Sequence, residues 1–427
     1  MRRLSAARLL RGHGWAVGPS VTSVAASGTA AATTLVIARG IGAAAFGHFT
    51  VVLTIALIVT VGMLMSLHFV MYQQLPRARP PERPALVTTA LFSTLVLAGA
   101  VVAAGLLASR QLTALFGVDF RTLCFALALA LALTVNQLTE SFLRGLRKFA
   151  FVAALKLAVA VAYLAAASFC LLVLGVRDAE LYLVALIGMY LVFAAMAVTG
   201  FEIVPRSFST ARARAMYRHG AYVTAIAALV AVLFGVDLIL LNHLADRADV
   251  GVYSVYNGLP RRLLVVVLTE GVGVVLLPTM ATADKPDLLR RIGRLSPAVG
   301  TAMAVFSFAA SAVFFLLLRA EYPYSPGLMA LSSVGIGAHT VFHLYLFALS
   351  MDGVRGARVL IACLAAGLPV VLACQAAFIA WWGMVGAMVA FALSNVLLVG
   401  VVVAATVRIY RPAGATRVGT PAGRAAP

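Results

Sequence analysis

The sequence has little charge for its length. Only 11% of its 427 residues are Asp, Glu, Lys or Arg, whereas 63% are hydrophobic and the mean hydropathy is +1.03. Because about 25% of the residues of a soluble globular domain are charged, this composition excludes an ordinary soluble protein. A membrane span needs about 20 mainly apolar residues, and such runs fill nearly the whole chain. The composition therefore predicts an all-α polytopic membrane protein with about twelve transmembrane helices.

Acidic residues and lysine are also scarce. The 14 acids face 33 basic residues, of which three are lysine, and the formal net charge is +19. Such a charge is compatible with a nucleic-acid partner, but cytoplasmic loops of membrane proteins carry excess Lys and Arg. With the N-terminus inside, 24 basic residues fall in the predicted cytoplasmic connections and tails, six in the opposite connections and three within spans. We therefore predict cytoplasmic termini, membrane lipids as the surroundings and no nucleic-acid partner.

The sequence lacks the patterns of a metal or catalytic centre. Its four cysteines lie in apolar runs without paired spacing, which indicates neither a disulfide framework nor a zinc site. His339 and His343 share one helix face, but no acid lies nearby, so hydrogen bonds between helices are favoured over a metal site. There is no GxxxxGK phosphate loop and no HExxH pattern. We expect no metal, no cofactor and no enzymatic activity, since the predicted outer connections of about ten residues leave no room for catalytic loops.

A basic connector near the middle divides the chain into two halves, and we expect it to include an amphipathic surface helix. The tail after the last span is basic and rich in Ala, Gly and Pro, which is typical of disorder. The predicted parts are a cytoplasmic N-terminal segment (1–18), an N-terminal lobe with spans one to six (19–200), the cytoplasmic basic linker (201–220), a C-terminal lobe with spans seven to twelve (221–407) and a disordered basic cytoplasmic tail (408–427).

The two halves resemble each other. Residues 47–50 (GHFT) align with residues 251–254 (GVYS) at an offset of 204, and Arg147 aligns with Arg355 at an offset of 208. Each half begins inside and has an even number of spans, so the halves have the same orientation. The pattern predicts two six-helix bundles related by an internal repeat, with a substrate site between them.

Four charged residues lie in one apolar stretch from 235 to 280: Asp237, Arg261, Arg262 and Glu270. A charge near the bilayer centre costs roughly 2.5 kcal/mol or more, so each of these residues is expected to face a partner or a wet cavity. The two arginines lie roughly 15 Å deep at 1.5 Å per residue, and Pro260 is expected to bend their helix. Guanidinium groups match phosphate oxygens, so the arginines are candidates to bind a pyrophosphate. The alternative is an internal salt bridge that locks two helices.

The remaining candidates concern coupling and gating. Asp237 is the natural partner of an arginine, and proton or sodium binding to Asp237 or Glu270 is one way to release it; a purely structural ion pair is the alternative. In the first half, Lys156 and Glu140 either pair with each other or serve as a contact to the head group and a gating carboxylate. Arg39, at the outer end of span one, is either a gate or substrate contact or an interfacial side chain.

Several segments resemble a known family. They are the turn RGIGAAAFGHF after span one, DLILLNHLADRADVGVYSVYN, LLPTM at the end of span eight and WGMVGAMVAF before span twelve. They look like the Wzx-type oligosaccharide-lipid flippases of the multidrug/oligosaccharidyl-lipid/polysaccharide exporter superfamily, over residues 21–407. The resemblance implies two lobes around a central cavity that carry a polyprenyl-pyrophosphate-linked oligosaccharide to the outer leaflet of the bacterial inner membrane, for surface polysaccharide biosynthesis. It also implies a polysaccharide polymerase and a chain-length regulator as partners.

Three alternatives stay open. A cation-coupled multidrug exporter of the same superfamily is less consistent with basic groups at mid-membrane depth, because excess cavity acids would suit a cationic drug. A peptidoglycan-precursor flippase of this superfamily would commonly have two further spans. A membrane enzyme acting on lipid-linked sugars would need larger outer loops than this chain has.

Overall fold

The computed structural model describes residues 14–266, 280, 284–318 and 322–410. In these ranges the chain is helical and has no strand, and nine helices are long and apolar enough to cross a membrane. The helices of the first half are α2 (Gly14–Leu64), α3 (Leu67–Gln74), α4 (Arg83–Leu107), α5 (Ser109–Phe116), α6 (Phe120–Gly145), α7 (Phe149–Leu172) and α8 (Ala179–Val198). Those of the second half are α9 (Thr210–Leu244), α10 (Arg247–Tyr253), the π-helical turn η3 (Ser254–Gly258), α11 (Leu259–Val266), α13 (Lys285–Leu318), α14 (Pro326–Ser350) and α15 (Gly353–Ile409).

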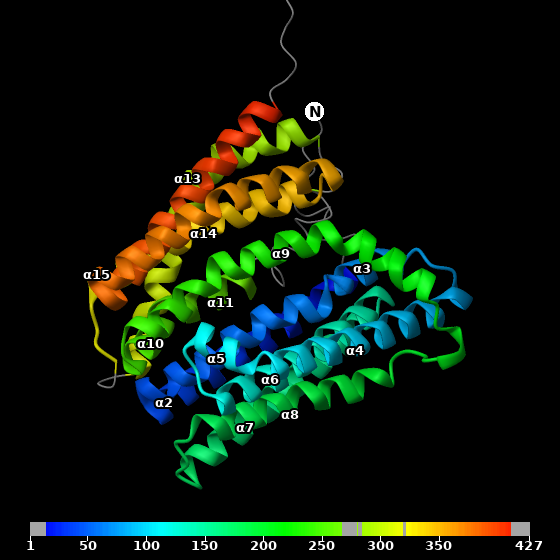
Figure 1. The fold of residues 1–427 in the computed structure, drawn as a ribbon, viewed down its shortest axis with the longest axis horizontal. Coiled ribbons are helices and arrows are strands. Elements are labelled where there is room, and N and C mark those ends of the chain that lie inside the picture. The colour runs from blue at the N-terminus through cyan, green and yellow to red at the C-terminus, as the bar shows by residue number, and fades with distance from the viewer. Residues whose placement is uncertain (1–13, 267–279, 281–283, 319–321, 411–427) are drawn as a thin grey trace, which may run out of the picture.

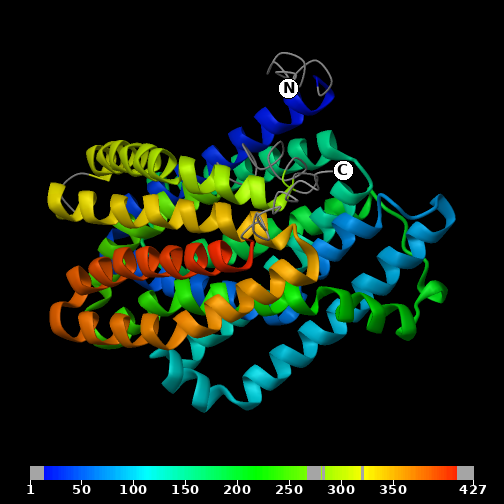
Figure 2. The ribbon, with the colours of Figure 1, turned by 90° about the horizontal axis from the view of Figure 1, so that it is seen from above.

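Two of these helices each supply two spans. A helix of 51 residues, such as α2, would measure about 77 Å at 1.5 Å per residue, far more than a bilayer core of about 30 Å. Both α2 and α15 are broken by a glycine with positive φ, Gly42 (φ 81°) and Gly383 (φ 54°), and Figure 2 shows α15 folding back on itself. The described helices thus account for eleven spans, and α10 to α11 begin a further one. The prediction of a polytopic all-α membrane protein is confirmed.

The helices form two groups. Figure 1 shows α2 to α8 on one side, here called the N-terminal bundle, and α9 to α15 on the other, the C-terminal bundle. We call the end of the molecule with Gly42, Gly383 and α10 the kink end, and the end with α3 and the first turns of α9 the connector end. At the kink end, side chains of both bundles share the largest buried apolar cluster of the described residues, which includes Phe46, Val250 and Tyr322. This cluster holds the bundles together there.

Glycines bring the two bundles into backbone contact at the kink end. A Cβ atom on Gly251 of α10 would lie 1.9 Å from the carbonyl oxygen of Ala43 in α2, and one on Gly47 would lie 2.2 Å from the carbonyl oxygen of Arg247. Real side chains do not approach so closely, so only glycine fits at either position. The sequence offset of 204 exchanges these two contacts, since Ala43 corresponds to Arg247 and Gly47 to Gly251.

A hydrogen bond lies on the same local two-fold relation. Ser254 Oγ donates to Thr50 Oγ1 over 3.0 Å, and these residues are themselves related by the offset of 204. In a two-fold contact a residue meets its own counterpart only next to the axis. The register found in the sequence is therefore the register in which the two halves meet, and the predicted internal repeat is confirmed.

Three helix boundaries differ from those predicted. The apolar run of the sequence predicts that span two ends near Tyr72, but α2 ends at Leu64, and positive φ angles at Met65 and Ser66 separate it from α3. The helix expected in the connector is not a separate element: it forms the first turns of α9, a helix of 35 residues that continues from N-cap Ser209 into the apolar run. The apolar run predicts that span nine begins near residue 296, and the helix that carries it, α13, begins earlier, at Lys285, because its basic first turns continue into the apolar run without a break.

Candidate functional site

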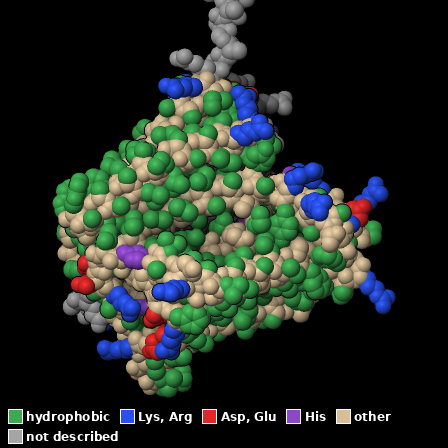
Figure 3. Space-filling model, in the orientation of Figure 1, with side chains coloured by type: hydrophobic (Ala, Val, Ile, Leu, Met, Phe, Trp, Pro, Cys, Tyr) green, Lys and Arg blue, Asp and Glu red, His purple; other side chains and the backbone are tan. Residues whose placement is uncertain are grey.

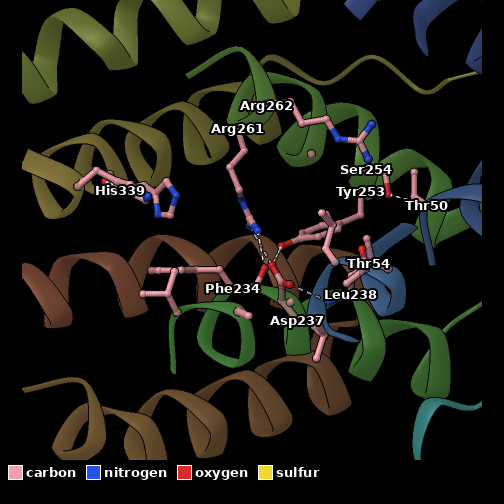
Figure 4. Close-up of a pocket in the computed structure, with 17 residues that line it drawn as sticks. Thr50, Thr54, Phe234, Asp237, Leu238, Tyr253, Ser254, Arg261, Arg262 and His339 are labelled. Atoms are coloured by element: carbon pink, nitrogen blue, oxygen red, sulfur yellow. Dashed lines mark hydrogen bonds and ion pairs between the residues drawn. The ribbon is translucent and has the colours of Figure 1, made fainter. Parts of the chain in front are cut away.

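A cavity of about 400 Å³ lies between the two bundles, and we call it the central cavity. Figure 3 shows the molecule hollowed between the bundles, and Figure 4 shows the lining side chains. Polar side chains reach it from α2, α9, the α10–α11 segment and α14: Thr50, Thr54, Asp237, Tyr253, Ser254, Arg261, Arg262, His339 and His343. Three of the four charges predicted from the sequence are thus at one site, and Glu270 lies outside the described residues.

Asp237 is the most buried charge of the cavity, with 1% exposure. Its Oδ2 accepts hydrogen bonds from Arg261 Nη2 (3.0 Å) and the Tyr253 hydroxyl (2.5 Å), and Oδ1 accepts from the Leu238 amide (2.8 Å). Asn257 Nδ2 in turn donates to the Tyr253 hydroxyl over 2.6 Å. A buried carboxylate is tolerated when its oxygens are satisfied in this way.

Arg261 makes contacts with helices α9 and α15. Besides its ion pair with Asp237, its Nη1 donates to the Phe234 carbonyl oxygen over 2.7 Å, one turn before Asp237 in α9. Its guanidinium also lies 4.3 Å from the ring centroid of Phe391 in α15, in the geometry of a cation–π contact. Arg261 therefore links α9, α11 and α15 within the C-terminal bundle, as the salt-bridge alternative predicted.

Arg262 points elsewhere. Successive helical residues are about 100° apart around the helix axis, and Figure 4 shows the two guanidinium groups turned to different sides. Arg262 lies close enough to the hydroxyls of Tyr163 and Tyr190 in the N-terminal bundle for electrostatic interaction. It makes no hydrogen bond or ion pair with any residue that the structure describes. Its charge is thus presented to the space between the bundles.

The helix carrying both arginines is widened directly before them. Pro260 has no amide hydrogen and its ring clashes with the carbonyl four residues earlier, that of Tyr256. The chain forms the π-helical turn η3 there, and Ser332 Oγ of α14 donates to the freed Tyr256 oxygen over 2.7 Å. The distortion predicted from Pro260 is therefore a local widening, and π-turns of this kind are frequent at functional sites.

The two histidines are held by hydrogen bonds. Asn395 Nδ2 donates to the Phe391 carbonyl oxygen (2.8 Å), so its Oδ1 accepts from His339 Nδ1 (2.8 Å). His343 Nδ1 lies 3.0 Å from the His339 carbonyl oxygen and donates to it. In the described part of the chain no group of His, Cys, Asp and Glu is suited to a metal ion. The sequence favours a polar cavity lining or interhelical hydrogen bonds for this pair: both residues line the central cavity, and His339 also bonds to Asn395 of α15.

Replacing Asn395 with leucine should lower stability, because the buried His339 Nδ1 loses its acceptor. An unsatisfied buried donor costs about 1–3 kcal/mol, so the thermal unfolding midpoint in detergent should fall by several degrees. Gln137→Leu is the matched control, since Gln137 makes no hydrogen bond in the described structure. Equal midpoints for the two variants would contradict this account of His339.

The candidates of the first half lie in a second cavity. It has a volume of about 200 Å³ within the N-terminal bundle, and we call it the N-bundle cavity. Glu140 Oε1 accepts from Lys156 Nζ (3.0 Å) and from Arg144 Nη2 (2.6 Å) there. Lys156 and Glu140 thus pair, as one predicted alternative had it, and both also line the cavity. Arg39 is exposed and lines neither cavity.

Sequence reasoning missed the aromatic hydroxyls. Tyr253 was aligned only as a repeat position, opposite Phe49, although its hydroxyl is what distinguishes the two. Asn257 follows it by one helical turn, which is the spacing that brings its amide to that hydroxyl. Tyr163 and Tyr190 carry no sequence signal, since each lies in an ordinary apolar run.

Comparison with known proteins identifies a matching family profile and solved structures with the same fold. The sequence profile described as "Polysaccharide biosynthesis protein" matches residues 18–283. No curated protein sequence matches the chain. The fold is similar to an inward-facing conformation of a multidrug resistance MATE family transporter of the MOP superfamily, with TM-score 0.66, 12% identity and coverage of 90% of this chain and 94% of that one.

Two further solved structures have the same fold. An outward-facing conformation of a multidrug resistance MATE family transporter matches with TM-score 0.62, 14% identity and coverage of 90% and 93%. The lipid II flippase MurJ in an inward closed conformation matches with TM-score 0.61, 9% identity and coverage of 90% and 86%. At these identities the likeness shows the fold alone. Because the profile covers more than half of the sequence, the chain belongs to the polysaccharide biosynthesis protein family.

Proposed function

We propose that the protein is a flippase that carries a polyprenyl-pyrophosphate-linked oligosaccharide from the cytoplasmic to the outer leaflet of the bacterial inner membrane. The observation that carries this proposal is Arg262, a guanidinium that faces the space between the bundles without a protein partner among the described residues. Holding an unpaired charge at this depth is costly unless it serves a ligand. A diphosphate suits a guanidinium better than other anions, because its oxygens accept two parallel hydrogen bonds.

The charge balance of the central cavity supports an anionic ligand. Of the described lining residues, Arg261 and Arg262 are basic and Asp237 is acidic, and Asp237 is taken by Arg261. The remaining positive charge would repel a cationic drug and attract a pyrophosphate. The proposal therefore ranks the lipid-linked substrate above the cation-coupled drug exporter. A peptidoglycan precursor shares the pyrophosphate, so it remains within the same chemistry.

The arrangement of the bundles supports alternating access. They meet backbone to backbone at the kink end, whereas Figure 1 shows α13 and α15 diverging from α4 and α6 toward the connector end. With the termini in the cytoplasm, as the distribution of basic residues predicts, this state receives its substrate from the cytoplasm. Parting of the kink end would then release the head group outside, to the polymerase and chain-length regulator that the function implies.

Arg262→Ala is expected to reduce flipping. Losing charge-assisted hydrogen bonds of about 1.5–3 kcal/mol corresponds to a roughly ten- to hundredfold lower initial rate. The measurement is the exposure of lipid-linked oligosaccharide in intact spheroplasts to an externally added sugar-modifying enzyme, with cells lacking the protein as the baseline. Arg110→Ala is the control, because Arg110 is exposed on α5 and lines neither cavity.

Two results would count against the proposal. If exposure is equal with and without the protein while resistance to toxic cations depends on it, the drug exporter is the better assignment. If exposure depends on the protein but Arg262→Ala equals Arg110→Ala, the protein flips a lipid without using Arg262 for its phosphate.

A further inference from the structure

The N-bundle cavity is lined by groups that suit a neutral, hydroxyl-rich ligand. Ser27 reaches it from α2, Asn136 from α6 and Tyr190 from α8, and the alanines around them leave room. The lining also contains Glu140 and Lys156, which form an ion pair; Glu140 is shared with Arg144, which lies outside the lining. A bundle interior exposed to lipid on its other faces has no structural need for so many polar groups in one place.

Asn136 supplies the amide side chain of this lining. It is 8% exposed, and its amide makes no hydrogen bond with any residue in the described ranges. The Asn395 amide behaves differently: it donates to the Phe391 carbonyl oxygen and accepts from His339. Buried polar side chains are normally hydrogen-bonded. An amide that both donates and accepts, and that opens into a cavity, indicates a ligand with the same double capacity, such as a sugar hydroxyl.

The two tyrosines add an aromatic wall. The Tyr163 hydroxyl is occupied, since it donates to the Tyr182 carbonyl oxygen over 3.2 Å. The Tyr190 hydroxyl has no hydrogen-bond partner among the described residues, although it belongs to the cavity lining. A tyrosine offers an apolar ring and a polar tip, which matches the apolar and hydroxyl-bearing surfaces of a pyranose.

Arg262 relates this cavity to the central one by charge. It lines the central cavity and interacts electrostatically with Tyr163 and Tyr190, which both line the N-bundle cavity. In the substrate class proposed above, a sugar is bonded directly to the pyrophosphate. A pyrophosphate held by Arg262 would therefore place that sugar beside Asn136 and Tyr190. At about 200 Å³ the cavity suits one sugar unit and not a whole oligosaccharide.

We propose that the N-bundle cavity is a sugar-binding subsite, in which Asn136 and Tyr190 hold the sugar unit next to the pyrophosphate and determine which sugar is accepted. This inference rests on the proposed function, because the pyrophosphate at Arg262 positions the sugar. It assigns the two bundles different tasks: the C-terminal bundle binds the phosphate and the N-terminal bundle reads the sugar. Leucine at position 136 removes the hydrogen bonds and keeps the branched shape, and phenylalanine at position 190 removes only the hydroxyl.

The test compares two probes on the purified full-length protein in nanodiscs. One probe is farnesyl pyrophosphate, and the other is farnesyl pyrophosphate linked in turn to glucose, galactose, N-acetylglucosamine and N-acetylgalactosamine. The wild type should bind at least one sugar-linked probe about tenfold more tightly than farnesyl pyrophosphate. Asn136→Leu and Tyr190→Phe should each remove most of this difference and leave the affinity for farnesyl pyrophosphate within twofold. Gln137→Leu, next to Asn136 on α6, is the matched control and should behave as the wild type.

The outcomes separate this inference from the proposed function. If no sugar-linked probe binds more tightly than farnesyl pyrophosphate, or if Asn136→Leu weakens both probes equally, the sugar subsite is wrong even though the phosphate site stands. If Arg262→Ala leaves the affinity for farnesyl pyrophosphate unchanged, the proposed function itself fails. A lower unfolding midpoint for Asn136→Leu than for Gln137→Leu would show a structural role for Asn136, and would also overturn the subsite.

Discussion

Gly251→Leu is expected to prevent closure of the kink end and to abolish flipping. The first side-chain atom at this position would meet the Ala43 carbonyl oxygen at 1.9 Å, and a helix backbone cannot move aside as a side chain can. Forced overpacking costs about 1–3 kcal/mol or more, and here all of that cost falls on the closed state. The equilibrium should therefore shift by roughly tenfold or more toward a state open at the kink end.

The measurement is the reactivity of a single cysteine placed at Phe46, which is fully buried between the bundles. In a background without the four native cysteines, a membrane-impermeant maleimide added outside should label Phe46→Cys at least tenfold faster when Gly251 is leucine. Gly62→Leu is the control. Gly62 lies in α2, the helix that carries Phe46, and a Cβ atom there would meet no atom within 4 Å. Unchanged labelling together with normal flipping would show that the contact at Gly251 is not part of the transport cycle.

Asp237→Leu is expected to give the largest loss of stability. It leaves the Arg261 guanidinium buried with its carboxylate partner removed, and breaking a buried ion pair on one side costs about 3–5 kcal/mol. It also removes the acceptor of the Tyr253 hydroxyl, which donates to Asp237 Oδ2 over 2.5 Å. The unfolding midpoint in detergent should fall steeply and the yield of folded protein should drop. Asp237→Leu combined with Arg261→Met should recover most of the loss, since both charges are then gone.

The double variant also separates structure from coupling. If Asp237 only locks α9 to α11, the stable double variant should flip its substrate with the wild-type dependence on proton and sodium gradients. If ion binding at Asp237 releases Arg261 during transport, the double variant should fold but lose that dependence. A double variant as unstable as Asp237→Leu would contradict the ion-pair account, because the damage would then come from packing at position 237.

Much of the architecture could be predicted from the sequence because it depends on local composition and period. Apolar runs long enough to span a bilayer force a helix, since backbone groups in lipid have no other partner. The sequence offset of 204 between residues 47–50 and 251–254 also relates the contacts between the two bundles, because the close backbone approach requires glycine at both Gly47 and Gly251. The extent of α9 was not predicted, because polarity changes along it without any residue that ends a helix.

The sequence by itself determined that the chain spans the membrane many times and that its halves repeat. It also determined that Asp237, Arg261 and Arg262 lie within membrane spans, where each must face a partner or a cavity. Only the tertiary structure decided how they differ. Arg261 and Arg262 are chemically identical neighbours, yet about 100° of helical rotation turns one to Asp237 and the other to the N-terminal bundle. Likewise, whether an amide such as Asn136 has a hydrogen-bond partner depends on which helix packs against it, and the sequence alone does not specify that helix.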